Sequence, residues 1–449
     1  MIGMGYLILL LIFELMLFLI AFTLSGKDIM APSVMMCIMF LISTCFTLLN
    51  VERWNIHYSL EACILISTGI LTFVMAETIF RFVFCRQLRG NKQIQEYHDV
   101  CAYDLKTWKL ILFLAFNMVV CILYLRNIVS TVGENLSNLS SYFVAYRRLG
   151  ISALKDKGIS GVRGYLHPLL WVVTASGYVS IYLFINNWIA GRKVIYKQVC
   201  LLLTLVVSAF PDMMSGGRSG ILKLGSAVLI TYYILWHQKN GWTRNLSWKY
   251  IRVGIVSLFV GIPAFYYSLG MLGRTTDKSI GDYVSYYLGA SIENFNQYLK
   301  APVKRGAWGE ESLVSVKKVL HYIGLGEISH FYNLEFRPIG SGSSNIYTFF
   351  RRPLHDFGIV GMYLFVVFIG FFFAWMYFKK IKYKEKRQTI SWVLIYGYFY
   401  YWMICSSMDQ YSQNFISAGA VIAITLILMI FHFITMDKFN RKIKIPLKS

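Results

Sequence analysis

Residues 343–362 read SSNIYTFFRRPLHDFGIVGM. Polar residues fill the first part of this stretch, and an apolar segment long enough to cross a bilayer follows without a break. The polar side chains are therefore expected at the mouth of a transmembrane helix, within reach of a charged lipid headgroup; the most informative are Arg351, Arg352, His355 and Asp356. Arginine and aromatic residues also mark helix ends as plain anchors, and the two arginines alone fit that interpretation equally well.

The composition of the chain is that of a membrane protein. Hydrophobic residues make up 57% and charged residues 15% of 449 residues, and the mean hydropathy is +0.54. A soluble globular domain of this length is excluded, and we expect an all-α polytopic membrane protein. The formal charge of +22 would suggest nucleic acid in a soluble protein, but no nucleic-acid module is found and the charge is assigned to membrane topology.

Motifs for metal and nucleotide chemistry are missing. The eight cysteines lie in apolar spans or basic loops without paired metal-ligand spacing, so neither a metal nor a disulfide framework is expected. There is no Walker A string, Asp-x-Asp, HExxH or GxSxG motif, which disfavours ATP-driven or nucleotide-sugar-dependent activity, and no cofactor is predicted.

Apolar segments predict about eleven transmembrane helices. The N-terminal one has no basic leader and no cleavage site, so it is expected to be a retained first helix. Glu14 lies inside it and should face protein or water. The predicted spans are 4–24, 30–49, 60–80, 110–129, 169–190, 199–209, 221–236, 253–272, 358–378, 392–405 and 418–433.

Basic residues favour an N-terminus outside and a C-terminus inside. In that orientation more than half of the 44 Lys and Arg fall in cytoplasmic segments, and the short outer loops hold almost none. The chain is then one integral membrane domain, 1–449, with two long outer loops. These are residues 130–168 and, between the eighth and ninth spans, the large outer loop 273–357.

The large outer loop carries clustered arginines and tyrosines. Guanidinium groups clamp phosphate through two hydrogen bonds, and aromatic faces stack on sugar rings. For any single tyrosine, packing of a small re-entrant subdomain against the membrane is the favoured alternative. Outside this loop, Arg218 lies in the string GGRSG. The glycines allow close approach of an anionic ligand near a helix start, although a simple turn would need the same glycines.

These features occur together in one known family. The chain resembles the bacterial oligosaccharide repeat-unit polymerases of the O-antigen polymerase (Wzy) class. The resemblance rests on Lys27-Asp28-Ile29 with Pro32-Ser33, on Trp54, on the glycine-flanked Arg218, on Gly309-Glu310, and above all on Asn345-Ile346-Tyr347-Thr348 with Asp356-Phe357-Gly358 and Gly361.

The resemblance implies glycosyl transfer at the outer face of the bacterial inner (cytoplasmic) membrane. Undecaprenyl-pyrophosphate-linked oligosaccharide would be the substrate, and membrane lipids and a chain-length regulator protein would be partners. Such a reaction needs cations for the departing pyrophosphate and a base for the acceptor hydroxyl. The base candidates are Asp356, His355 and Glu310; the candidates for binding substrate or pyrophosphate are Arg218, Arg274, Arg351, Arg352, Asn345 and Tyr347.

Two other functions stay open at this point. An O-antigen ligase would share the spans and the arginine-rich outer loop, but it would use a different acceptor. A flippase or transporter for lipid-linked oligosaccharide would be expected to show internal hydropathy repeats, and no convincing repeat is present.

Overall fold

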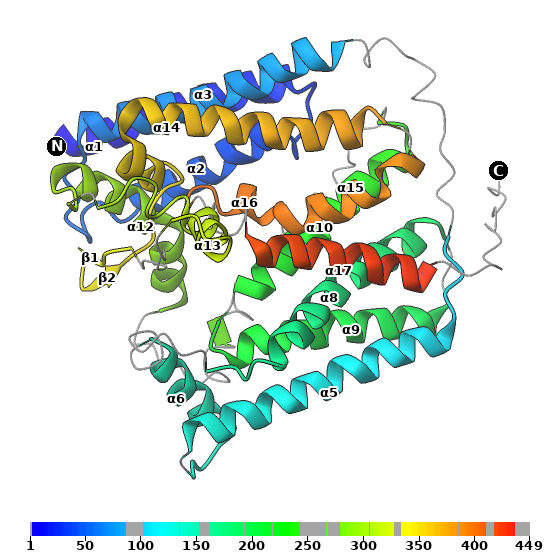
Figure 1. Ribbon diagram of the computed structural model, residues 1–449. Helices are drawn as coiled ribbons and strands as arrows, with labels where there is room; N and C mark the ends of the chain where they lie inside the picture. Colours follow the sequence, from blue (N-terminus) through cyan, green and yellow to red (C-terminus); the bar gives the residue numbers. More distant parts are fainter. Residues whose placement is uncertain are drawn as a thin grey trace. The chain divides into compact units, whose positions relative to one another are not determined.

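The computed structural model describes most of the chain, and nearly all of the described residues that form regular structure are helical (Figure 1). It forms two compact units: unit 1 contains Met1–Ile94, Lys278–Lys384 and Tyr401–Val421, and unit 2 contains Gln95–Asp277, Glu385–Tyr400 and Ile422–Ser449. The described residues are 2–86, 102–133, 135–151, 161–191, 194–217, 219–242, 266–267, 279–304, 306–326, 334–384, 386–409 and 417–435.

Unit 1 is built around three N-terminal helices and α14. Helices α1, α2 and α3 pack on one another, α14 runs along α3, and α12 packs on α2 (Figure 1). Their bounds are α1 Ile2–Leu24, α2 Pro32–Leu48, α3 Leu60–Phe84, α12 Ile280–Lys300, α13 Val314–Tyr322, α14 Arg351–Ala374, a π-helix Trp375–Lys382 and α16 Tyr401–Ile404. The strands β1 Arg337–Ile339 and β2 Gly342–Ser344 form an antiparallel hairpin.

Local sequence explains where these helices begin. Pro32 opens α2, at a position where its missing N–H costs nothing. Ser59 caps α3 by accepting a hydrogen bond from the backbone N–H of Ala62, and Ser279 caps α12 in the same way through the N–H of Asp282.

Helix α12 agrees with the alternative that the aromatic residues of the large outer loop pack a small subdomain. Residues 289–296 of this helix are all buried, with Ile292 and Phe295 fully inaccessible. It approaches α2 so closely that a Cβ at Gly289 would lie 2.9 Å from the backbone of α2. The loop therefore folds back onto the helices, and Tyr283 and Tyr298 are buried packing residues rather than an open sugar-binding surface.

The carboxyl group inside the first helix faces protein, as predicted. Glu14 is fully buried, and its Oε1 accepts a 3.0 Å hydrogen bond from the hydroxyl of Thr44 on α2. This contact pairs a polar group that would be costly in lipid.

Unit 2 contains the remaining helices. Helix α9 packs on α5 and α8, and α10 packs on α8 and α15. A buried 2.8 Å hydrogen bond from Ser176 to Asn117 joins α8 to α5. The bounds are α5 Thr107–Val132, α6 Leu139–Ile151, α8 Leu166–Ile189, α9 Ile195–Met214, α10 Ser219–Lys239, α15 Lys386–Phe399 and α17 Ala418–Thr435, which starts in unit 1.

Helix α9 is longer than the short span predicted for it. It continues through Pro211, which lies between the predicted spans 199–209 and 221–236. Proline removes the hydrogen bond to the carbonyl four residues earlier. That carbonyl, of Val207, instead accepts a 3.6 Å contact from the Cys121 thiol, so the helix can pass the proline.

Eight helices among the described residues are long and apolar enough to cross a membrane, and α2 is a shorter apolar helix. The predicted span 253–272 falls outside the described residues except for Tyr266 and Tyr267. The predicted span 392–405 is divided between α15 and α16. The chain is thus an α-helical protein with several membrane-crossing helices, while the count of about eleven and the orientation stay predictions.

Candidate active site

The stretch that precedes the ninth predicted span folds as a short helix followed by a break. Helix α14 begins at Arg351, but Gly358 has φ 71° and ψ −173°, a conformation open in practice only to glycine. Residues 351–357 therefore form a separate segment, and the long apolar part of α14 starts after Gly358, where the sequence predicted a span to begin.

Aromatic residues fix this short segment on unit 1. Phe349 and Phe350 are fully buried, and the Phe350 ring lies 5.4 Å from the ring of Phe40 on α2. The same ring lies so close to Gly69 on α3 that a Cβ there would approach it to 2.6 Å. The backbone just before Arg351 is therefore held by α2 and α3.

Arg351 is a buried structural cation. Its guanidinium donates to Glu311 at 2.5 Å and to Glu335 at 2.6 Å, and it lies 4.4 Å above the ring of Tyr298. None of its surface is accessible. The sequence suggested that Arg351 binds a ligand, but its guanidinium is already bound by two of the chain's own carboxylates.

Arg352 is also paired within the protein. Its Nε and Nη2 atoms donate to the two oxygens of Asp409, at 2.8 and 3.0 Å. This fork-to-fork geometry is the one in which a guanidinium binds a carboxylate most specifically. Both arginines therefore lie in the interior, not at an open membrane surface as the sequence suggested.

Asp356 binds the backbone of a neighbouring loop through its carboxylate. Its two carboxylate oxygens accept hydrogen bonds from the N–H of Glu311 at 3.2 Å and from the N–H of Ser312 at 2.6 Å. The side chain is almost fully buried. Its surroundings fit an acceptor for a loop better than a base that must meet a substrate hydroxyl.

His355 connects two polar side chains. Its Nδ1 lies 3.2 Å from the Tyr298 hydroxyl, and its Nε2 lies 3.0 Å from Oε1 of Glu310. An ionised carboxylate can only accept, so Nε2 carries the proton and donates to Glu310. In the neutral imidazole, Nδ1 then accepts from Tyr298.

Glu310 is the carboxylate with room for a further partner. Its Oε1 also accepts from the N–H of Gly306 at 2.9 Å, and its Oε2 accepts from the N–H of Ala307 at 3.2 Å. Its side chain is 18% exposed. Each carboxylate oxygen can accept two hydrogen bonds, and among the described residues the one recorded for Oε2 comes from Ala307.

The same contacts set the charge of Glu310. Partial burial raises its pKa, but the hydrogen bonds from His355 and from the two backbone N–H groups outweigh burial, so the pKa lies below its usual value. Glu310 is therefore ionised at neutral pH.

Glu311 behaves in the opposite way. Burial raises the pKa of Glu311 above its usual value, and the charge of Arg351 only partly offsets this. Two adjacent carboxyl groups thus differ in role: Glu311 pairs with a buried arginine, while Glu310 turns toward the surface.

Three consecutive side chains of the short helix hold one loop. We refer to residues 306–312 as the Glu310 loop. His355 contacts Glu310, Asp356 binds the backbone of Glu311 and Ser312, and the Phe357 ring lies 4.9 Å from that of Trp308. The Glu310 loop is therefore attached to the point where the long apolar part of α14 begins.

Tyr347 and Asn345 lie nearby without an open binding face. Tyr347 is buried; its hydroxyl donates to the carbonyl of Glu335 and accepts from Nε of Arg337 at 3.2 Å. Burial of the Tyr347 hydroxyl raises its pKa well above the usual value. Asn345 follows β2 and is partly buried, and the carbonyls on either side of it, of Ser344 and Ile346, accept from Asn294 on α12.

Arg218 and Arg274 lie outside the described residues. The glycines beside Arg218 are described, and they pack against the side chain of Asp212. The Asp212 carboxylate accepts from the N–H of Gly220 at 2.6 Å, and a Cβ at Gly217 or Gly220 would lie 2.8 Å from the Asp212 side chain. The start of α10 is thus capped internally.

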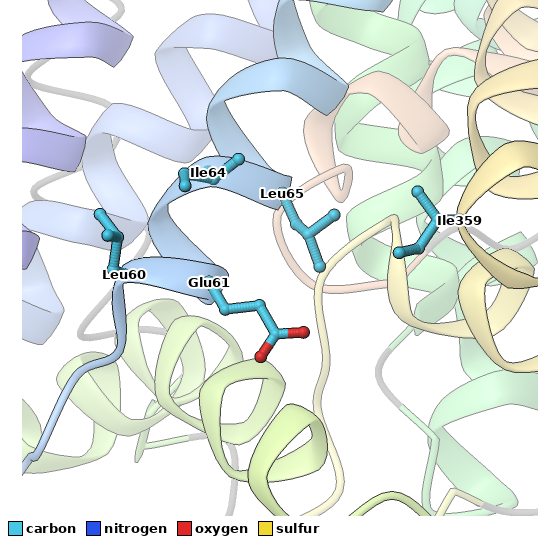
Figure 2. Close-up of a pocket in the computed structure, with 5 residues that line it drawn as sticks. All are labelled: Leu60, Glu61, Ile64, Leu65 and Ile359. Atoms are coloured by element: carbon cyan, nitrogen blue, oxygen red, sulfur yellow. The ribbon is translucent and has the colours of Figure 1, made fainter.

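A shallow apolar recess of about 320 Å³ lies beside the start of the long apolar part of α14. Figure 2 shows Ile359 on α14 across from the α3 side chains that complete the lining, which are Leu60, Glu61, Ile64 and Leu65. Ile359, the residue of α14 that lines the recess, follows Asp356 by three positions. It offers an apolar surface next to the polar cluster.

Sequence reasoning missed most of the partners in this cluster. Glu311, Glu335 and Asp409 carry no motif, and the signal that could have pointed to them is the cost of burying two arginines without carboxylates. In the described part of the chain, no group of three His, Cys, Asp or Glu side chains is placed to hold a metal ion.

Searches of family models, curated proteins and solved structures found no protein that matches this chain.

Proposed function

We propose that this protein is a glycosyltransferase of the bacterial inner membrane that polymerises undecaprenyl-pyrophosphate-linked oligosaccharide repeat units at the outer face. The observation that carries the proposal is the Glu310 carboxylate. It is ionised, held by His355 and two backbone N–H groups, and open on one oxygen beside the start of a membrane-crossing helix.

In the proposed reaction a sugar hydroxyl of the incoming unit attacks the anomeric carbon of the growing chain. A new carbon–oxygen bond forms there, and the bond from that carbon to the lipid pyrophosphate breaks. The pyrophosphate leaves with the electron pair, and the hydroxyl proton passes to Oε2 of Glu310. No nucleotide sugar or redox partner is required.

His355 is a positioning residue in this scheme. It donates to Glu310 and is itself fixed by Tyr298, so it aims the carboxylate without touching the substrate. Asp356 has a similar indirect role, because it fixes the backbone of Glu311 and Ser312 next to the base.

We place a short part of the lipid chain beside Ile359, where the recess is apolar. Arg351 and Arg352 are bound by carboxylates, so we do not assign them to the leaving pyrophosphate. Arg218 and Arg274 stay candidates for that role from sequence, and Lys304, beside the Glu310 loop, is exposed.

Deleting the gene and displaying the surface glycolipids on a gel tests the proposal. A polymerase predicts loss of the ladder of long chains with a single repeat unit retained on the lipid core. Loss of every attached unit would instead indicate a ligase, and an unchanged ladder would overturn the proposal.

A further inference from the structure

Helix α13 and the turn after it expose a group of large apolar side chains. Tyr322 is 84%, Ile323 64% and Leu325 61% exposed, and Val319 and Leu320 are exposed to a lesser degree. Single exposed apolar residues are ordinary, but a contiguous group of this kind marks a contact surface.

The group follows the helical repeat. Val316, Val319, Leu320 and Ile323 are spaced i, i+3, i+4 and i+7, which places them on one face. The opposite face is basic; it carries Lys317, Lys318 and His321. A short helix with one apolar and one basic face is typical of segments that lie in the interface of a membrane.

The start of α13 is fixed at the level where α14 enters its long apolar part. Ser312, two residues before α13, donates its N–H to Asp356 at 2.6 Å. Asp356 is two residues before Gly358, where that part of α14 starts. The chain therefore enters α13 close to the point where the long apolar part of α14 begins.

We propose that α13 lies flat on the membrane, with Val319, Leu320 and Ile323 inserted among the lipid chains. Lys317, at the side of the helix, then extends to the phosphates of anionic lipids, Lys318 faces water, and Tyr322 sits at the boundary, where a ring with a polar end is favoured. A bilayer is favoured over a protein partner because the helix starts at membrane level and pairs an apolar face with basic residues.

This docking is independent of the reaction and of which side of the membrane is outside. It also has a consequence for the Glu310 loop, which leads directly into α13. With α13 on the lipid surface, the open carboxylate of Glu310 is held near the headgroups.

Photocross-linking in the full chain tests the docking. The photoreactive residue p-benzoylphenylalanine replaces Ile323, and the protein is irradiated in vesicles of phosphatidylethanolamine and phosphatidylglycerol. Mass spectrometry of the peptide containing position 323 then measures lipid adducts. The matched variant carries the same residue in place of Lys318 on the basic face, and a positive control carries it in place of the exposed Leu364 on α14.

We expect about tenfold more lipid adduct at position 323 than at position 318. Leu320→Asp, combined with the probe at 323, should lower the adduct several-fold, because a carboxylate on the apolar face opposes insertion. The inference is overturned if position 364 forms lipid adducts and position 323 does not, or if position 323 links to protein, from the same chain or a second copy.

Discussion

The side chains of His355 and Glu310 lie 3.0 Å apart, Nε2 to Oε1, although 45 positions separate them in the chain. The contact joins the short helix at the start of α14 to the Glu310 loop. It also lowers the pKa of the carboxyl group that we propose as the base.

Removing this contact should change the pH dependence of activity. The usual pKa of a glutamate side chain is 4.5, and that of Glu310 in the wild type is lower, so Glu310 stays ionised to a lower pH. His355→Leu removes a hydrogen bond that favours the ionised form, so the pKa of Glu310 rises and activity is lost at a higher pH. His355→Gln, which keeps an N–H donor, should partly restore the profile.

The same shift fixes the sign of its effect on stability. Because the pKa of Glu310 is lower in the folded protein, its contribution is present above pH 4.5 and is lost as the pH falls through the lowered value. The prediction for activity is checked by measuring kcat/KM against pH for wild type, His355→Leu and His355→Gln. The same loss of activity at low pH in wild type and His355→Leu would contradict it.

Arg351→Met should remove folded protein rather than activity alone. The change leaves Glu311 and Glu335 without their buried cation, which costs about 3–5 kcal/mol. Thermal unfolding of the detergent-purified protein and its abundance in membranes are the measurements. Arg53→Met, at an exposed ion pair with Asp282, is the control and should leave both unchanged.

A well-folded but inactive Arg351→Met protein would return Arg351 to the pyrophosphate-binding role that the sequence suggested. The double variant Arg351→Met with Glu311→Gln should regain part of the stability, because it removes one of the two unpaired carboxylates.

Asp356→Asn should lower stability by about 1–3 kcal/mol, because an amide offers one acceptor and sets its NH2 group against the other backbone N–H. Activity should fall as well, through displacement of the Glu310 loop. An Asp356→Asn protein that unfolds at the wild-type temperature and yet makes no polymer would make Asp356 the better candidate for the base.

Gly358→Ala should destabilise the protein by about 1–3 kcal/mol, since its backbone conformation is closed to residues with a Cβ. Gly5→Ala on α1 is the matched control: an added Cβ there meets no atom within 4 Å, and stability should be unchanged or slightly higher. Equal unfolding temperatures for the two variants would show that the break before the apolar part of α14 carries no constraint.

The sequence predicted the class of protein and the point at which the long apolar part of α14 begins. Apolar runs identify membrane helices, and the change from polar to apolar residues at Gly358 coincides with a real break in α14. Packing of the tyrosines of α12 was an open alternative, but its contact with α2 was not predicted, because that contact depends on a glycine and small polar residues rather than on an apolar run.

The environment of the arginines could not be predicted for a related reason. The carboxylates that bind Arg351 and Arg352 come from positions 16, 40 and 57 residues away, and nothing in the local pattern selects them. Adjacent Glu310 and Glu311 look alike in sequence, and only the fold turns one to the surface and the other to Arg351.

The most direct test of the account is polymerisation by purified protein. Wild type and Glu310→Gln are reconstituted in vesicles with undecaprenyl-pyrophosphate-linked repeat units and no nucleotide sugar, and the products are separated on a gel. Wild type should form a ladder, and Glu310→Gln should be slower by about 10²–10⁴-fold at the same amount of folded protein. Glu52→Gln, an exposed carboxylate outside the site, should match wild type. A normal ladder from Glu310→Gln, or no ladder from folded wild type, would contradict the account.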